Sequence, residues 1–212
     1  MPRRTHEDSL ETKNNILASA QRLFSRRGFE RTSLSDIAKY AGVTRGAIYW
    51  HFENKEELLV AMIENLENVK FSIDLLHDAC DPNQRDPLSK LKSWLNTTVL
   101  DENTKFINSA LMSLIISIMN GSAGNEEAKQ KLLGLAKMRH DQIAQALKNC
   151  ISKGQLPQNM VVNSAVEHLG VFLIGYCHQS RFNLADSIGK RFDLFVDFEI
   201  ETMKRITVDA IS

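Results

Sequence analysis

The chain has little cysteine and no long apolar run, and each shortage excludes a class of protein. Its 212 residues include three cysteines, Cys80, Cys150 and Cys177, whose odd number and wide spacing favour reduced thiols in a cytoplasmic protein over a disulfide framework. No run of about 18 apolar residues is present, so no membrane-spanning helix is expected. The polar first residues lack the apolar segment of a signal peptide, which also favours the cytoplasm.

Motifs of catalysis and metal binding are missing as well. The sequence contains no HExxH, phosphate-binding glycine loop, G-x-S-x-G elbow or CxxC pair. His77 and Cys80 have the spacing of two metal ligands, but no second pair accompanies them. Cys177 and His178 are adjacent and so face different directions on a helix, which argues against a nucleophile–base couple. We therefore expect no enzyme, no metal and no cofactor.

Charge is balanced over the whole chain but not along it. The composition, 43% hydrophobic and 25% charged with a formal net charge of zero, is that of a globular protein. Residues 1–52 nevertheless hold nine Lys and Arg against five Asp and Glu, which leaves 17 against 21 for the remainder. A basic N-terminal module beside an acidic remainder fits a DNA-binding head on a larger body.

The stretch from Ser33 to Phe52 predicts two short helices joined by a tight turn. Ser33 with Asp36 three residues later is a capping signature for the first helix. Gly42 is suited to end that helix in the left-handed conformation, and Thr44 to cap the next one. A preceding helix over about 9–27, ended by Gly28, would pack its apolar face against this pair. The pattern predicts a helix-turn-helix in a three-helix head.

The second helix of the pair presents residues that a DNA major groove can use. Arg45 and Tyr49 lie four apart on one side, where Arg can make a bidentate contact with guanine and hydroxyls can reach bases or phosphates. Gly46 costs the helix about 1 kcal/mol relative to Ala, which close approach to another molecule would explain. The alternative is an ordinary helical hairpin in which Tyr49 and Trp50 pack against other helices.

These residues resemble the TetR family of bacterial transcriptional regulators. The resemblance covers about residues 10–60 and rests on Thr32-Ser33, Asp36-Ile37-Ala38, Ala41-Gly42-Val43, Thr44-Arg45-Gly46-Ala47-Ile48-Tyr49-Trp50-His51-Phe52 and Asn54-Lys55. The run TRGAIYWHF is most similar to the subgroup that represses multidrug efflux pumps. The resemblance implies a dimer that binds a DNA operator and is released by a small effector.

The remainder of the chain predicts only helices, so the expected fold class is all-α. Helical periodicity covers about 54–76, 87–100, 106–119, 125–151, 163–182 and 188–208, and the segment 106–119 is apolar on nearly all sides. We expect a helix-turn-helix DNA-binding domain over 1–53 and a larger helical ligand-binding and dimerisation domain over 54–212. By the family resemblance, the two C-terminal helices would pair with those of a second subunit; the alternative is packing within one chain.

Methionine and aromatic side chains of the body suit an adaptable apolar pocket for a small lipophilic or cationic effector. The candidates for its walls are Met62, Phe71, Phe106, Met112, Met119, Met138, Phe172 and Tyr176. For each of these residues the alternative is a plain core position, because such side chains at helical spacing usually pack in the core.

The resulting hypothesis is a ligand-responsive dimeric repressor that binds a pseudo-palindromic DNA operator, with no membrane partner. The expected DNA-contacting residues are Ser33, Thr44, Arg45, Gly46, Tyr49, His51 and Lys55. One alternative is a helical enzyme or partner-binding module that keeps the helix-turn-helix as a packing unit. Another is a repressor controlled by a protein or by oxidation of a thiol.

Overall fold

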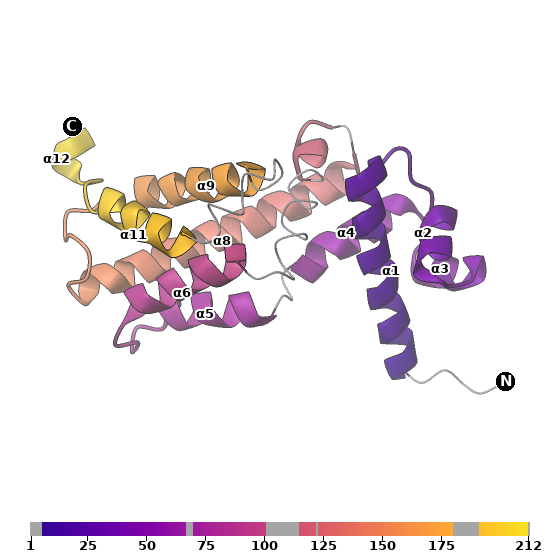
Figure 1. The fold of residues 1–212 in the computed structure, drawn as a ribbon, viewed down its shortest axis with the longest axis horizontal. Coiled ribbons are helices and arrows are strands. Elements are labelled where there is room, and N and C mark those ends of the chain that lie inside the picture. Colours follow the sequence, from indigo (N-terminus) through magenta and orange to yellow (C-terminus); the bar gives the residue numbers. More distant parts are fainter. Residues whose placement is uncertain (1–5, 67–69, 101–114, 122, 180–190, 212) are drawn as a thin grey trace. The chain divides into compact units, whose positions relative to one another are not determined.

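The computed structural model describes the whole chain except residues 1–5, 67–69, 101–114, 122, 180–190 and 212. Its helices are α1 (His6–Arg27), α2 (Leu34–Ala41), α3 (Arg45–His51), α4 (Lys55–Leu66), α5 (Lys70–Cys80), α6 (Pro87–Leu100), α8 (Glu126–Ser152), α9 (Val162–Gln179), α11 (Phe192–Met203) and α12 (Val208–Ile211) (Figure 1). Among the described residues the only β feature is an isolated bridge between Met160 and Thr207. The all-α prediction is confirmed.

The chain divides into two compact units. Unit 1 comprises the described parts of residues 1–67 and 110–134, and unit 2 those of 68–109 and 135–212. Helix α4 therefore belongs to the same unit as the three N-terminal helices, whereas the functional boundary predicted at residue 53 stays a prediction.

The core of unit 1 is the apolar face shared by α1, α2 and α3. Ile16, Ile37 and Ile48 are fully buried, and Phe52 is 2% exposed. Helix α1 packs on α2, as its apolar spacing predicts, and it also packs on α4. Burial of four large apolar side chains at about 1.5–3 kcal/mol each is the main force holding so small a head together.

The turn at Gly124, just before α8, packs on α4 within unit 1. Gly124 has φ +72°, and a Cβ on it would lie 2.8 Å from Leu59 Cδ2. Glycine is favoured there, because the backbone lies in the left-handed region and a Cβ would also displace the Leu59 side chain of α4. Just beyond it, Asn125 caps α8, since its Oδ1 accepts from Ala128 N at 2.9 Å.

Unit 2 is built on a helical core between α5, α6, α8, α9 and α11. Leu76, Leu91, Leu95, Leu147 and Leu169 are fully buried in one apolar cluster. In this cluster the centroid of the Phe192 ring lies 4.4 Å from that of Tyr176 and 5.7 Å from that of Phe172.

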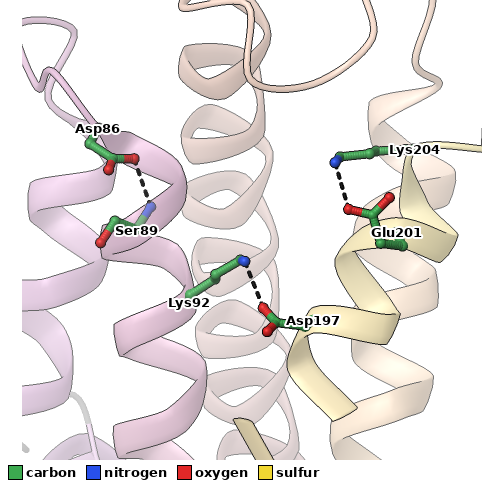
Figure 2. A network of polar contacts seen from close by, with 6 residues as sticks. All are labelled: Asp86, Ser89, Lys92, Asp197, Glu201 and Lys204. Carbon is green, nitrogen blue, oxygen red and sulfur yellow. Dashed lines mark hydrogen bonds and ion pairs between the residues drawn. The ribbon is translucent and has the colours of Figure 1, made fainter. Parts of the chain in front are cut away.

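Polar side chains fix α6 in place at the surface of this core. Asp86 Oδ1 accepts from Ser89 N at 3.0 Å, which caps α6 just before Pro87. Lys92 of α6 and Asp197 of α11 point toward one another and pair at 2.6 Å, while Glu201 and Lys204 pair within the last turn of α11 and its cap (Figure 2). Exposed pairs of this kind stabilise by about 0–1 kcal/mol, so they set orientation more than stability.

Three helix predictions need correction or lie outside the description. The helix expected over 54–76 corresponds to α4 and α5, with the undescribed residues 67–69 between them. The helix expected over 188–208 corresponds to α11, which ends at Met203. Beyond it the chain leaves the helical path, and the carbonyl of Ile206 accepts from Val161 N at 2.9 Å. Most of the apolar helix over 106–119 lies outside the described residues, and in its described end Ile116 and Met119 are each 43% exposed, so that end is not buried all round.

Candidate nucleic-acid interface

The first helix of the pair, α2, starts with a complete capping box. Ser33 Oγ accepts from Asp36 N at 3.1 Å, and Asp36 Oδ2 accepts from Ser33 N at 3.0 Å and from the Ser33 hydroxyl at 2.5 Å. These hydrogen bonds, first the one from the hydroxyl, lower the pKa of the Asp36 carboxyl below its ordinary value. Both donors of Ser33 are therefore already used inside the head.

The turn between α2 and α3 depends on glycine and on two side-chain caps. Gly42 has φ +68°, in the left-handed region, and Val43 N donates to Ala38 O at 3.0 Å, which closes the end of α2. Thr44 Oγ1 then accepts from Ala47 N at 3.1 Å and starts α3. From α1, the Asn15 side-chain amide donates to Ala41 O at 2.8 Å, so the turn is also fixed to the first helix.

The outer face of α3 is exposed and chemically distinct from its inner face. Arg45 is exposed with its Cζ 5.7 Å from the ring centroid of Tyr49, which is 46% exposed. A Cβ on Gly46 would meet nothing closer than Thr44 Oγ1 at 4.0 Å. No crowding within the head requires glycine at this position, so its helix-destabilising effect has no internal explanation.

The aromatic residues of α3 do not behave as packing residues. Trp50 is 73% exposed, and its ring meets that of His51 edge-on at 4.6 Å. Together with the exposure of Tyr49, this excludes the helical hairpin in which both aromatic residues pack against other described helices. Trp50 was not among the predicted DNA-contacting residues. Its position next to Tyr49 on a short amphipathic helix could have indicated that it lies on the exposed side.

His51 and Lys55 are half-buried at the far end of α3 and the start of α4. The His51 ring also lies 6.2 Å from that of Phe52. Lys55 Nζ donates to Phe29 O at 2.9 Å and lies 4.4 Å from the Phe29 ring centroid. An ammonium has three N–H donors, so Lys55 keeps capacity for another partner while it holds the 28–32 loop.

Three predicted DNA-contacting residues share one open depression of about 480 Å³ in unit 1: Ser33, Tyr49 and Lys55. Its lining also includes four acidic side chains, Glu30, Asp36, Glu53 and Glu56, against two basic ones, Arg31 and Lys55. The other predicted contacts, Thr44, Arg45, Gly46 and His51, do not line it. Because carboxylates repel phosphate, the face of α3 is the better surface for nucleic acid than this depression.

The candidate wall residues of an effector pocket fall in different places. Met62 is buried in unit 1, whereas Phe172 is half-buried and Tyr176 buried in unit 2. Met119 and Met138 are 43% and 39% exposed, which does not favour them as walls. Phe106 and Met112 lie outside the described residues, as does the side chain of Phe71. Of the candidates whose side chains the structure describes, Phe172 and Tyr176 are brought together, because both rings contact that of Phe192.

The two described cysteine side chains are poor candidates for redox control. Burial raises the pKa of Cys150 to about 12, and the thiol is inaccessible. Burial also raises the pKa of Cys80, whose Sγ donates to Gln142 O at 3.1 Å. Because the thiolate is the reactive form, both groups react slowly at neutral pH. The side chain of Cys177 lies outside the description.

Metal-binding clusters and membrane-spanning helices are the features that would indicate other classes of protein. In the described part of the chain, no group of three or more His, Cys, Asp or Glu side chains is placed to hold a metal ion. Among the described helices, none is long and apolar enough to cross a bilayer.

A capped helix pair that presents an exposed Arg, Tyr and Gly face defines a helix-turn-helix DNA-binding protein. Residues 16–62 match the family model "Bacterial regulatory proteins, tetR family". The chain is 35% identical over 179 residues to the transcriptional regulator TtgR of Pseudomonas putida (82% of each chain), and 37% identical over 169 residues to the regulator AcrR of Shigella flexneri (78% of this chain and 76% of AcrR). The chain belongs to the TetR family, and it is a transcriptional regulator, not an enzyme.

The likeness extends to solved structures of whole regulators. The crystal structure of NalD, the secondary repressor of the MexAB-OprM multidrug efflux pump in Pseudomonas aeruginosa, superposes with a TM-score of 0.67 at 28% identity. The match covers 95% of this chain and 98% of NalD, so it includes both the head and the helical body.

Proposed function

We propose that the chain is a ligand-responsive repressor in the cytoplasm that binds a pseudo-palindromic operator as a homodimer and controls a multidrug efflux system. The observation that carries the DNA-binding part is the outer face of α3, where Arg45, Gly46 and Tyr49 are exposed with no internal role that requires them. The efflux part follows from the similarity to NalD, which is a repressor of such a pump.

In this proposal α3 enters the major groove. Arg45 reads a base, with guanine favoured because its O6 and N7 accept both N–H groups of a guanidinium. Gly46 lets the helix approach the bases, and Thr44 and Tyr49 contact bases or phosphates beside it. The exposed Trp50 adds an apolar surface and an indole N–H to the same face.

The phosphate contacts are proposed to lie at the ends of this face. His51 and Lys55 approach the backbone near the start of α4, where the helix N-terminus also favours an anion. Because both donors of Ser33 are bound to Asp36, its contact with a phosphate requires the capping box to open or the phosphate to be reached through water.

Dimerisation is proposed to use α9 and α11. Large apolar side chains are exposed on both helices: Val171 (73%) and Ile174 (55%) on α9, and Leu194 (48%), Phe195 (38%) and Phe198 (58%) on α11. An apolar surface of this kind is typical of a protein–protein interface. A two-fold dimer would present two α3 helices to half-sites about 34 Å apart.

Release by an effector is proposed to act through the body. A small lipophilic or cationic compound that binds more tightly to a spread arrangement of the heads shifts the dimer away from the operator. A coupling of about 1–3 kcal/mol would change operator affinity about 5- to 150-fold.

The test is operator selection from random DNA followed by fluorescence anisotropy. Native protein is compared with Arg45→Ala and with Arg85→Ala, which removes the same charge from an exposed loop of unit 2. We expect Arg45→Ala to lose about 1–3 kcal/mol of binding free energy for the selected sequence, and Arg85→Ala to lose much less. Tetraphenylphosphonium, a lipophilic cation, then tests release.

Two outcomes would contradict the proposal. If selection enriches no sequence, or if Arg45→Ala binds the selected DNA as tightly as the native protein, α3 does not read DNA. If specific binding holds but no lipophilic compound or cation releases it, the ligand-responsive part fails and control by a protein partner becomes the better hypothesis.

A further inference from the structure

Lys13 of α1 lies against the end of α3. Its Nζ is 5.8 Å from the centroid of the Phe52 ring, and Phe52 is the residue that directly follows α3. Phe52 is 2% exposed, whereas Lys13 is half-buried. A lysine in such a position buries its apolar stem and keeps its ammonium in water. The charge of Lys13 is therefore at the surface of the head, beside the helix end that carries His51.

Two neighbours of Lys13 on α1 fix its position relative to the helix-turn-helix. The side-chain amide of Asn15 donates to Ala41 O at 2.8 Å, and Ile16 is fully buried in the core of unit 1. This turn of α1 cannot shift against α2 and α3 without breaking these contacts. The backbone that carries Lys13 is therefore in place before any partner binds.

The charge of Lys13 has no carboxylate to neutralise it on its own helix. Side chains three or four positions away are the ones that can pair with it. At these positions of α1 the chain has Ser9, Leu10, Ile16 and Leu17. The ion pairs formed among the described residues do not include Lys13 either. Its three N–H donors are therefore open to an anion from outside the head.

Lys13 also lies outside the acidic depression of the head. That depression is lined by four acidic and two basic side chains, and Lys13 is not one of them. An anion is repelled by the carboxylates of the depression, whereas Lys13 attracts it beside Phe52. When the recognition helix of a helix-turn-helix is in the major groove, the anions around it are DNA phosphates.

We propose that Lys13 contacts a backbone phosphate of the operator and so extends the DNA interface from α3 to α1. The inference deepens the proposed function and rests on it for α3 as the helix that enters the groove. Lysine binds phosphate as a point charge, and such a contact is the same for every base sequence. Lys13 therefore adds affinity and fixes the register of α3, but it does not select a base.

The salt dependence of DNA binding tests the contact. Each phosphate that a protein neutralises on B-DNA contributes about 0.9 to the slope of log affinity against log salt. A dimer with Lys13 in both heads should therefore lose about 1.8 from this slope in Lys13→Gln. Between 50 and 200 mM salt, the fall in affinity should be about 12-fold smaller for the variant than for native protein. Fluorescence anisotropy on the selected operator measures both slopes.

Three further variants serve as controls. Lys13→Arg keeps the charge and should keep the native slope. Lys148→Gln removes an exposed charge from α8 in unit 2 and should also keep it. Lys39→Gln removes an exposed charge from α2 in the same head and should change the slope little. If Lys39→Gln lowers the slope as much as Lys13→Gln, the net charge of the head sets the slope and the proposal is overturned.

A modified operator shows whether Lys13 itself makes the contact. A methylphosphonate replaces one charged phosphate oxygen by a methyl group and so removes one negative charge at one position. A scan of single methylphosphonates along a half-site should find a position at which native protein loses about 5-fold in affinity at 0.15 M salt. Lys13→Gln should lose much less at that position. If the two proteins respond alike at every position, Lys13 does not contact a phosphate.

A purely structural role for Lys13 would give a different result. Loss of its contact with the Phe52 ring would lower the melting temperature and leave the salt slope as in native protein, which would refute the proposal. Lys13→Met keeps an apolar stem over Phe52, so it replaces Lys13→Gln if that variant does not fold. The same loss of slope is expected of it.

The outcome can be separated from that of the proposed function. Phosphate contacts do not depend on sequence, so the slope is also measured on a random duplex. If selection enriches no operator but Lys13→Gln lowers the slope on the random duplex, the phosphate contact stands and the sequence-specific assignment fails. If the operator is bound specifically and Lys13→Gln keeps the native slope, only the role of Lys13 fails.

Discussion

The guanidinium of Arg45 lies over the ring of Tyr49, with Cζ 5.7 Å from the ring centroid. The two residues are one helical turn apart on the exposed face of α3, so the ring restricts the rotamers of the arginine before any DNA is present. A side chain that is already ordered loses less entropy on binding, which favours a bidentate contact.

We therefore expect Arg45 and Tyr49 to be coupled in operator binding. A cation–π contact at an exposed site is worth about 0.5–1 kcal/mol. Tyr49→Leu should weaken binding to the selected operator more in the native background than in Arg45→Ala, by an amount in this range. Anisotropy on the four proteins of a double-mutant cycle measures it. Additive effects would mean that the two residues bind DNA independently.

Gly46 is predicted to be unfavourable for the head and favourable for DNA binding. A Cβ there meets open space, so Gly46→Ala should raise the free energy of unfolding of the head by up to about 1 kcal/mol. The same methyl group should weaken operator binding, because it projects from the face that enters the groove. Thermal melting and anisotropy on the same preparations test the two signs.

Gly134 provides the matched control for Gly46. It lies within α8, is exposed, and a Cβ there would also meet nothing within 4 Å. Gly134→Ala should therefore raise the free energy of unfolding to a similar extent, while operator affinity stays unchanged. If the Gly46→Ala protein is more stable than the native protein and binds the operator with the same affinity, Gly46 has no role in DNA recognition.

The capping box of α2 predicts a specific pH dependence. The folded pKa of Asp36 is lowered by Ser33, so its stabilising effect is fully present above the ordinary carboxyl pKa and is lost as pH falls through the folded pKa. Asp36→Asn keeps an oxygen acceptor but not the charge. It should lower the melting temperature at neutral pH, and the difference from native protein should shrink and vanish as pH falls through the folded pKa of Asp36.

A control variant in unit 2 tests whether loss of any one carboxylate would lower the melting temperature in the same way. Asp74→Asn removes an exposed carboxylate of α5, and it should change the melting temperature little at either pH. If the deficit of Asp36→Asn persists at low pH, it arises from the altered side chain and not from ionisation of Asp36.

The sequence predicted the local features of the head well. The Ser33 and Thr44 caps and the Gly42 turn depend on hydrogen bonds between residues three to five apart, which spacing alone can indicate. The inward direction of Ile48 and Phe52 followed from helical periodicity in the same way.

Features that depend on distant residues were not predictable in this way. The bond of Lys55 to the carbonyl of Phe29 joins residues 26 apart, and the end of α11 depends on a bond between Ile206 and Val161. The apolar exposure of α9 and α11 is a further case, because a periodic pattern marks an apolar face without saying whether the same chain covers it.

That exposed face yields the last prediction. Val171 is 73% exposed on α9, and a charge there would be buried if α9 pairs with a second copy of the chain. Val171→Glu should convert the dimer to a monomer in sedimentation velocity and lower operator affinity, because an isolated head reads a single half-site. Val208→Glu places the same charge on α12, where Val208 is 57% exposed, and should leave the dimer intact. A Val171→Glu protein that remains dimeric would show that the two copies pair through another surface.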